Sequence, residues 1–204
     1  MSNIIDIFSI PAGVYDYPND CTNELSLVKN LEYLNSSSNS VSNDKFLLNR
    51  KDFEILHSFC TAAVNDYWSN VLKNSGHLAI IISWANKTQS NQSHHKHYHS
   101  NSVISGSFYF DSVVETPITL CNPNEKLKWY DVETIEQNKY NSNEISLAID
   151  KPGVILFPSY LDHYVKSNET TQERYSIAFN TFFQGTIGSL KNATFLGQEI
   201  DIVE

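Results

Sequence analysis

The chain has 204 residues, 41% of them hydrophobic and 12% aromatic, which is enough apolar surface for a packed core and excludes global disorder. Its net charge of -9, without a cluster of Lys or Arg, opposes binding to nucleic acid or to an anionic membrane surface. We expect a single domain over 1–204, with 1–76 as an N-terminal strand, loop and supporting helix and 77–190 as a β core.

The cysteine pattern and the start of the chain bear on its compartment. Cys21, Cys60 and Cys121 lie far apart and lack a paired metal spacing, so we expect free thiols in a reducing environment. The first residues show no basic segment followed by a long apolar run, and no stretch approaches the roughly 20 apolar residues that cross a bilayer. These features predict a cytoplasmic protein.

Three N-terminal segments carry different patterns. The apolar run 4–10, followed by Pro11 and Gly13, predicts a strand that a turn ends. Segment 35–44 is rich in Ser and Asn without apolar periodicity, which predicts an exposed loop. Apolar residues then recur at spacings of three and four, which predicts one amphipathic helix over about 51–73.

The remainder of the chain reads as short strands. Apolar runs rich in β-branched and aromatic residues are separated by polar turns, which is typical of a sandwich or a barrel. We therefore expect a mainly β domain with one supporting helical region. The predicted strands are 78–86, 102–110, 116–122, 145–149, 153–158 and 174–183.

Five of the seven histidines gather in two places. His94, His95, His97 and His99 crowd together, and His163 follows an apolar strand. Alternate residues of a strand face the same side, so His97 and His99 can direct both imidazoles to one point. An H-x-H pair alone would as readily indicate a His-rich surface loop, but the distant third histidine favours a metal site on His97, His99 and His163.

Arg174 and Ser176 open the last predicted strand and face the same side of it. The opposite face is apolar, so Arg174 is expected on a wall with little water. A guanidinium fork matches a carboxylate in a bidentate, charge-assisted pair, and Ser176 can add a hydrogen bond. An exposed edge-strand arginine is the alternative for this tripeptide alone; beside the histidines, the pair indicates an anion site.

Five motifs in this order resemble a family of bacterial and phage 2-oxoglutarate/iron(II) oxygenases. The resemblance covers most of the chain, and the combination is far more specific than any single motif. The motifs are SWAN (83–86), H-x-H-x-N-S-x-I-S-G-x-F-Y (97–109), F-P-S-Y-L-x-H (157–163), R-x-S-I-A-F-N (174–180) and G-T-I-G (185–188).

The resemblance implies a double-stranded β-helix (jelly roll) with iron(II) at one mouth, bound by His97, by the residue two further on and by His163. It implies a dioxygenase, usually a hydroxylase, that consumes 2-oxoglutarate and dioxygen and acts on a small-molecule or peptide substrate. The R-x-S pair, Arg174 and Ser176, would hold the distal carboxylate of 2-oxoglutarate.

Two further residues lie near the expected metal strand. We expect Tyr109 and Asn101 to make polar contacts to the cosubstrate.

One position departs from the usual pattern. Most oxygenases of this type bind iron through two histidines and one carboxylate, and His99 occupies the carboxylate position here. Three neutral imidazoles also suit Zn, Cu or Ni. Asp162 cannot easily take the place of a ligand, because a strand points it away from His163.

Two rival functions remain open at this point. A cupin-type dioxygenase with three histidines on its metal and no 2-oxoglutarate is favoured by His99 and opposed by Arg174 and Ser176. A non-catalytic jelly-roll module that binds a carbohydrate or a peptide would leave the histidines as surface residues, and its metal content after purification separates it from both enzymes.

Overall fold

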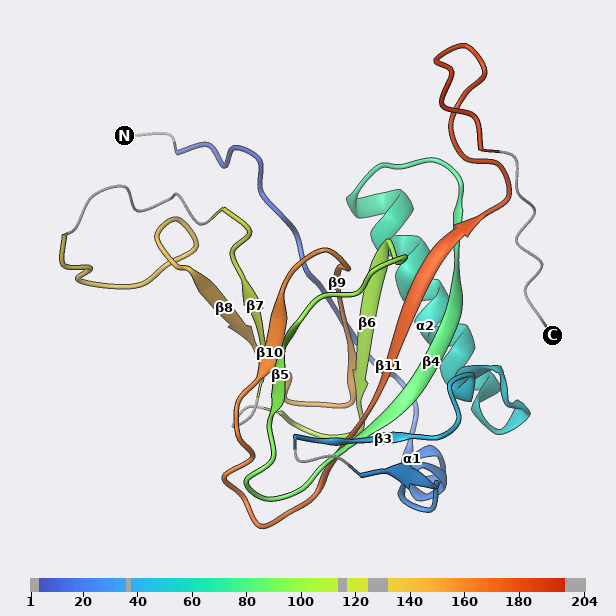
Figure 1. Ribbon diagram of the computed structural model, residues 1–204, viewed down its shortest axis with the longest axis vertical. Helices are drawn as coiled ribbons and strands as arrows, with labels where there is room; N and C mark the ends of the chain where they lie inside the picture. Colours follow the sequence, from blue (N-terminus) through green and yellow to red (C-terminus); the bar gives the residue numbers. More distant parts are fainter. Residues whose placement is uncertain (1–3, 36–37, 114–116, 125–131, 197–204) are drawn as a thin grey trace.

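A computed structural model describes residues 4–35, 38–113, 117–124 and 132–196. Antiparallel strands follow one long helical segment in the chain (Figure 1). In chain order the elements are β1 (Gly13–Asp16), α1 (Thr22–Lys29), β2 (Tyr33–Leu34), β3 (Ser40–Ser42), η1 (Leu47–Asn49), η2 (Lys51–Phe53), α2 (Glu54–Asp66), η3 (Tyr67–Val71), β4 (His77–Thr88), β5 (His94–His97), β6 (Ile104–Tyr109), β7 (Ile118–Cys121), β8 (Glu144–Leu147), β9 (Gly153–Pro158), β10 (His163–Val165) and β11 (Arg174–Gln184).

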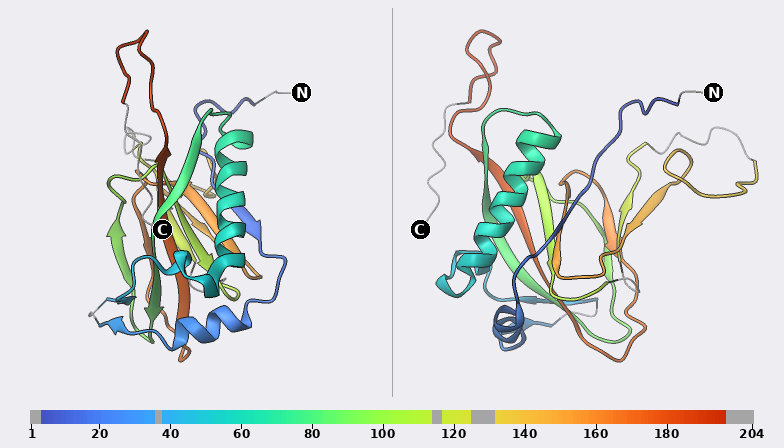
Figure 2. Two further views of the ribbon diagram at one scale, coloured as in Figure 1. Left: turned by 90° about the vertical axis from the view of Figure 1, so that its right-hand side faces the viewer. Right: turned by 180° about the vertical axis from the view of Figure 1, so that it is seen from behind.

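The strands form two antiparallel sheets that face each other, in the mainly β, jelly-roll arrangement predicted from the sequence (Figures 1 and 2). The strand order is β1-β9-β6-β11-β4-β3-β2 in the larger sheet and β5-β10-β7-β8 in the smaller sheet. Strand β11 pairs with β4 along its length and with β6 from Ser176 to Asn180. It is therefore held from both sides across the middle of the larger sheet.

The outer face of the larger sheet packs against α2 (Figure 2). Phe108 of β6 and Ile177 and Phe179 of β11 share one apolar cluster with Leu56 and Cys60 of α2, and all five side chains are fully buried. Burial of apolar surface stabilises by roughly 25 cal/mol per Å². Helix and sheet therefore stabilise each other, and the predicted helical segment spans 51–71 as η2, α2 and η3 without a break.

A smaller apolar cluster lies between the two sheets. It joins Ile155 and Phe157 of β9 to Ile118 of β7 and Val165 of β10. Because this cluster fills the interior next to β9, the open space between the sheets is displaced toward β11 and β4, where a pocket lies.

The predicted strand over 4–10 is wrong. No strand forms in this segment, and its apolar side chains are exposed, with Phe8 97% and Ile7 73% accessible. The first strand is β1, which begins at Gly13, inside the predicted turn, and pairs with β9. The apolar run 4–10 therefore forms no strand, because the residues that pair with the edge strand β9 are the next ones along the chain, Gly13–Asp16.

The predicted exposed loop over 35–44 is also wrong in its described part. Strand β3 lies there and pairs with β4, and Ser40 and Ser42 are buried. The Ser42 hydroxyl accepts the N–H of Ala85 and donates to the carbonyl of Asp44. Small polar side chains thus satisfy backbone groups inside the fold. Strand β3 pairs the predicted N-terminal part, 1–76, with β4 of the predicted β core, 77–190, and the single domain over 1–204 stays a prediction.

The six strands predicted after residue 76 are all present in the described residues, each with ends shifted by at most a few positions; residue 116 of one of them lies outside the described residues. Seven elements in the described part of the chain were not among the predicted helix and strands: β1, α1, β2, β3, η1, β5 and β10. The three cysteines are free, as predicted. None of the helices in the described residues is long and apolar enough to span a membrane.

Candidate metal centre and pocket

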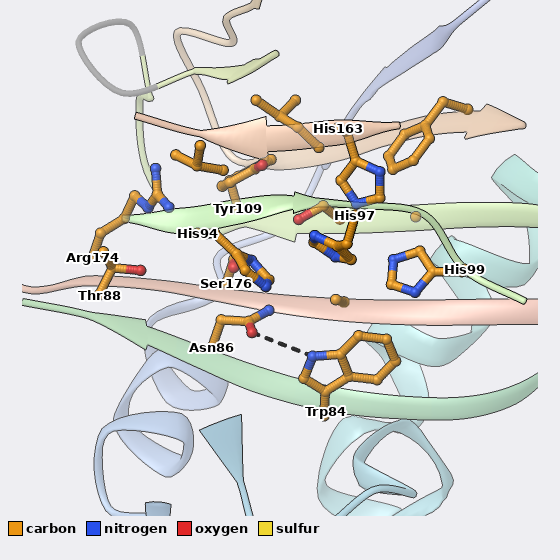
Figure 3. A pocket seen from close by; sticks show the side chains of 16 residues that line it. Trp84, Asn86, Thr88, His94, His97, His99, Tyr109, His163, Arg174 and Ser176 are labelled. Carbon is orange, nitrogen blue, oxygen red and sulfur yellow. Dashed lines mark hydrogen bonds between the residues drawn. The ribbon is translucent and has the colours of Figure 1, made fainter. Parts of the chain in front are cut away.

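A pocket lies between the sheets, and its two ends carry different chemistry (Figure 3). Strands β4 and β11 provide one wall, because alternate residues of each face the interior. Histidines at the end of β5 and the start of β10 provide the opposite wall. Arg174 lies at one end and His99 at the other, with Tyr109, Ser176 and His94 between them.

Three histidine rings meet at one end of the pocket. His97 and His163 are register partners across β5 and β10, and their ring centroids lie 4.3 Å apart. His99 follows the end of β5, with its ring 5.0 Å from that of His97 and 5.1 Å from that of His163. One ring nitrogen from each lies within 4.8 Å of the others. The structure thus brings together the three residues proposed from the sequence as metal ligands.

Hydrogen bonds fix which nitrogen of two rings faces the shared point. Nδ1 of His97 lies 2.8 Å from the His95 carbonyl, and Nδ1 of His163 lies 3.0 Å from the Leu161 carbonyl. A carbonyl only accepts, so each Nδ1 carries the proton and each Nε2 keeps a lone pair. This backbone support of a histidine is common around metal ions, where it orients the ring.

Burial keeps these imidazoles neutral. Burial, and to a smaller extent the neighbouring histidines, lower the pKa of His163 to about 3, against the opposing effect of the Leu161 carbonyl; burial and then His97 lower the pKa of His99 to about 4. Burial also lowers the pKa of His97. Only neutral imidazole binds a metal. The donor set therefore fits a divalent cation that accepts nitrogen ligands.

His94 also lines the pocket, and the sequence did not single it out from its neighbours. Its ring lies 4.4 Å from that of His97, on the side toward Ser176 (Figure 3). Burial, and then the nearby histidines, lower its pKa to about 3. His95 does not line the pocket. Period-two alternation along β5 fails to find His94, because the β5–β10 register shifts between His97 and His94.

The far end of the pocket is a wall of hydrogen-bond donors. Arg174 and Ser176 face it from β11, as the sequence predicts for their side chains, and Ser176 is buried. Tyr109 is 2% exposed and lies beside Arg174. Burial raises the pKa of Tyr109 and the Arg174 guanidinium lowers it, so the phenol stays protonated. Such a wall suits an anion.

Asn86 adds a donor that sequence reasoning missed. Its Oδ1 accepts hydrogen bonds from Trp84 Nε1 at 3.3 Å and from Asn39 Nδ2 at 3.3 Å. The amide is thereby oriented with its nitrogen toward the pocket (Figure 3). Alternation along β4 could have placed Trp84 and Asn86 on the pocket wall, but the bond from Asn39 depends on tertiary structure.

Two other expectations have definite positions. Asn101 lies in the turn after β5, is exposed and adopts a left-handed backbone with φ of 55°; it is not among the residues that line the pocket, so the expected cosubstrate contact has no support. The turn, rather than a continued strand, directs it outward. Asp162 pairs with Lys96 at 3.4 Å, outside the pocket. No Asp or Glu among the described residues lines the pocket.

Residues 82–180 match a family model described as "Putative 2OG-Fe(II) oxygenase". The matched segment runs from β4 into β11 and contains every residue of the three-histidine cluster together with Arg174 and Ser176. No curated protein matches the chain.

Solved structures share the fold at low identity. An oxidoreductase of the 2OG-Fe(II) oxygenase family from Burkholderia pseudomallei is 13% identical, with a TM-score of 0.55 over 78% of this chain and 75% of that one. HygX from Streptomyces hygroscopicus, with nickel, 2-oxoglutarate and hygromycin B bound, is 9% identical, with a TM-score of 0.59 over 84% and 82%. A prolyl-4-hydroxylase from Pseudomonas putida is 8% identical, with a TM-score of 0.58 over 86% and 92%. Residues 82–180 thus resemble this oxygenase family, and the chain shares its fold with solved structures that include members of that family.

Proposed function

We propose that this protein is an oxygenase that uses iron(II), 2-oxoglutarate and dioxygen to hydroxylate a small-molecule or peptide substrate in the pocket between its sheets. The observation that carries the proposal is the pairing of three converging imidazoles with a guanidinium at the other end of the same pocket. Structurally similar HygX binds hygromycin B, which supports a small-molecule substrate.

His97, His99 and His163 are the proposed metal ligands. Their fixed tautomers and low pKa values supply three neutral nitrogen donors. Three protein ligands on a six-coordinate ion leave positions for other molecules. When bound, the iron and 2-oxoglutarate supply the oxidising chemistry. The protein's part is to orient the reactants and to keep water out, for which the apolar walls formed by Phe157 and Val165 are suited.

Arg174 and Ser176 are the proposed partners of the distal carboxylate of 2-oxoglutarate. The guanidinium is largely withdrawn from water, so an anion there forms a charge-assisted pair with little competition from solvent. Tyr109 beside it keeps its proton and is a further proposed donor to the cosubstrate. Asn86 joins this set, because its amide nitrogen faces the same space.

A second candidate is a three-histidine metal dioxygenase that does not use 2-oxoglutarate. The absence of an acidic side chain among the described lining residues favours it. Arg174 and Ser176 oppose it, because the guanidinium fork and the hydroxyl on the pocket wall match a carboxylate that such a reaction does not use.

Anaerobic titration of the metal-free protein with iron(II) and then 2-oxoglutarate tests the proposal. We expect a weak visible charge-transfer band on addition of 2-oxoglutarate, and succinate once air is admitted. Failure to see both would exclude a 2-oxoglutarate-dependent reaction. Retained iron binding without the band would favour the second candidate.

Arg174→Leu separates the two candidates further. We expect it to abolish the response to 2-oxoglutarate while iron(II) still binds. Arg50→Leu is the matched control, because Arg50 lies in surface ion pairs with Asp44 and Asp52. If both variants respond to 2-oxoglutarate like the wild type, Arg174 does not bind it.

A further inference from the structure

Four polar residues of the sequence motifs do not line the pocket, yet they lie together and three of them are buried: Ser102, Ser105, Ser159 and Asn180, the polar cluster. Ser159 is 0% exposed, Ser105 2% and Asn180 9%. They come from the turn after β5, from β6, from the turn after β9 and from β11. Buried hydroxyls are costly unless hydrogen-bonded, so their arrangement needs a reason.

Proton counting gives the cluster a direction. Ser105 donates its single proton to Asn180 Oδ1 at 2.8 Å, so its 2.8 Å contact with Ser159 needs the Ser159 proton. The 2.7 Å contact between Ser159 and Ser102 then needs the Ser102 proton, for which the carbonyls of Thr181 at 3.2 Å and Ile104 at 3.3 Å are the more distant acceptors. Ser102 in turn accepts the N–H of Thr181. Ser159 is thus both an acceptor and a donor in the middle of one continuous chain.

The backbone of Ser159 holds the turn that carries His99. Its carbonyl accepts the His99 N–H at 3.0 Å, and its own N–H donates to the Val103 carbonyl at 3.1 Å. His99 lies beyond the end of β5, so this pair of bonds takes the place of strand pairing.

The same residue begins the turn that leads to His163. Leu161 donates its N–H to Pro158, and its carbonyl holds Nδ1 of His163. The hydroxyl of Ser159, anchored through Ser105 to β11, therefore fixes the turn after β9 against the larger sheet. That turn holds the backbone of His99 through Ser159 and the ring of His163 through Leu161.

We propose that Ser159 is a positioning residue that sets the spacing between His99 and His163, with Ser102, Ser105 and Asn180 as its anchors. The inference rests on the proposed metal ligands. It follows because metal ligands must be held to within about 0.5 Å of their working geometry, and the two backbone hydrogen bonds of Ser159 join the turn that carries His99 to the turn that leads to His163.

Cobalt(II) titration of metal-free protein tests this, with visible absorption reporting both affinity and coordination geometry. Ser159→Ala is expected to bind cobalt about 10- to 100-fold more weakly than the wild type, with an altered spectrum, as for other supporting groups around metal ligands. Ser83→Ala is the matched control: its hydroxyl is equally buried and accepts the Leu48 N–H, on the face of β4 away from the pocket. Both variants should lower the melting temperature of the metal-free protein, but Ser83→Ala should keep wild-type cobalt affinity within about twofold.

Ser102→Ala serves where Ser159→Ala does not fold, because Ser102 is only partly buried, and a smaller loss of affinity is expected. Equal cobalt affinity and equal spectra in the serine variants and the control would overturn the inference while leaving the metal site intact. A wild type that binds no cobalt would overturn the proposed ligands themselves.

Discussion

The two sheets differ in how they are supported and in what they contribute to the site. The larger sheet is packed against α2 and supplies Arg174, Ser176 and Asn86 from long, paired strands. The smaller sheet consists of short strands with partly exposed outer residues, and it and its adjoining turns supply His97, His99 and His163. The comparison teaches that the end of the pocket with Arg174, the proposed anion end, is held by the core. The end with the three histidines, the proposed metal end, depends on local hydrogen bonds.

Core truncation in the two sheets should have unequal costs. Leu156 of β9 is fully buried, and Leu156→Ala is expected to lower the free energy of unfolding by about 3 kcal/mol. Leu147 of β8 is only partly buried against the smaller cluster, and Leu147→Ala should cost about 1 kcal/mol. Urea unfolding measures both, and equal costs would contradict the division into a strongly and a weakly supported sheet.

Removing one of the three proposed metal ligands should weaken metal binding. His163→Gln is expected to weaken iron(II) or cobalt(II) binding by at least about 100-fold, because two imidazoles remain of three. His77→Gln, at the exposed start of β4, is the control and should bind metal like the wild type. Isothermal titration of the metal-free proteins measures this, and a His163→Gln protein with wild-type affinity would remove His163 from the site.

Acid should destabilise the metal-free protein through the buried histidine. The pKa of His163 is about 3 in the fold, against 6.5 ordinarily, so below pH 6.5 the unfolded chain binds a proton that the folded chain does not. The free energy of unfolding should fall by about 1.4 kcal/mol per pH unit from this group as the pH drops toward 3. Urea unfolding at pH 7, 6 and 5 should show a shallower dependence in His163→Gln; identical slopes would argue against a buried neutral imidazole.

A conservative change at the anion end should have the smallest effect. Arg174→Lys keeps the charge but loses the planar fork, so 2-oxoglutarate should bind about tenfold more weakly while metal affinity is unchanged. Fluorescence or calorimetric titration of 2-oxoglutarate into metal-loaded protein measures it. A parallel loss of metal affinity would show that the two ends of the pocket are not independent.

The sequence predicted the parts of the molecule whose signal is local. Strands β9 and β11 are apolar runs of a length typical of buried strands, and the period of two along a strand places Arg174 and Ser176 on one face. Strand β5 was not among the strands predicted from apolar runs, because its sequence, HHKH, has no apolar pattern. Only the H-x-H spacing suggested an extended segment there, and the pairing of β5 with β10 comes from tertiary structure. The strand predicted over 4–10 was wrong for the opposite reason: the segment has the composition of a strand, but in the described residues it pairs with no other strand.

The same distinction applies to the site. His97, His99 and His163 could be proposed because their residue type is rare and their spacing is informative. The position of His94 could not be proposed, since it depends on a register shift in β5, and the orientation of the Asn86 amide could not, since it depends on a hydrogen bond from Asn39. Asn101 was misplaced because the chain turns directly after His99.

Strand β11 carries Arg174 at one end of the pocket and Asn180 near the turns that bear the histidines. Side chains on a strand return to the same face only at every second residue, so inserting one residue between them would turn the guanidinium out of the cavity, and inserting two would restore its direction about 6.6 Å further away. On the proposed role of Arg174, a change in the length of the bound diacid that is made along β11 therefore comes in steps of two residues.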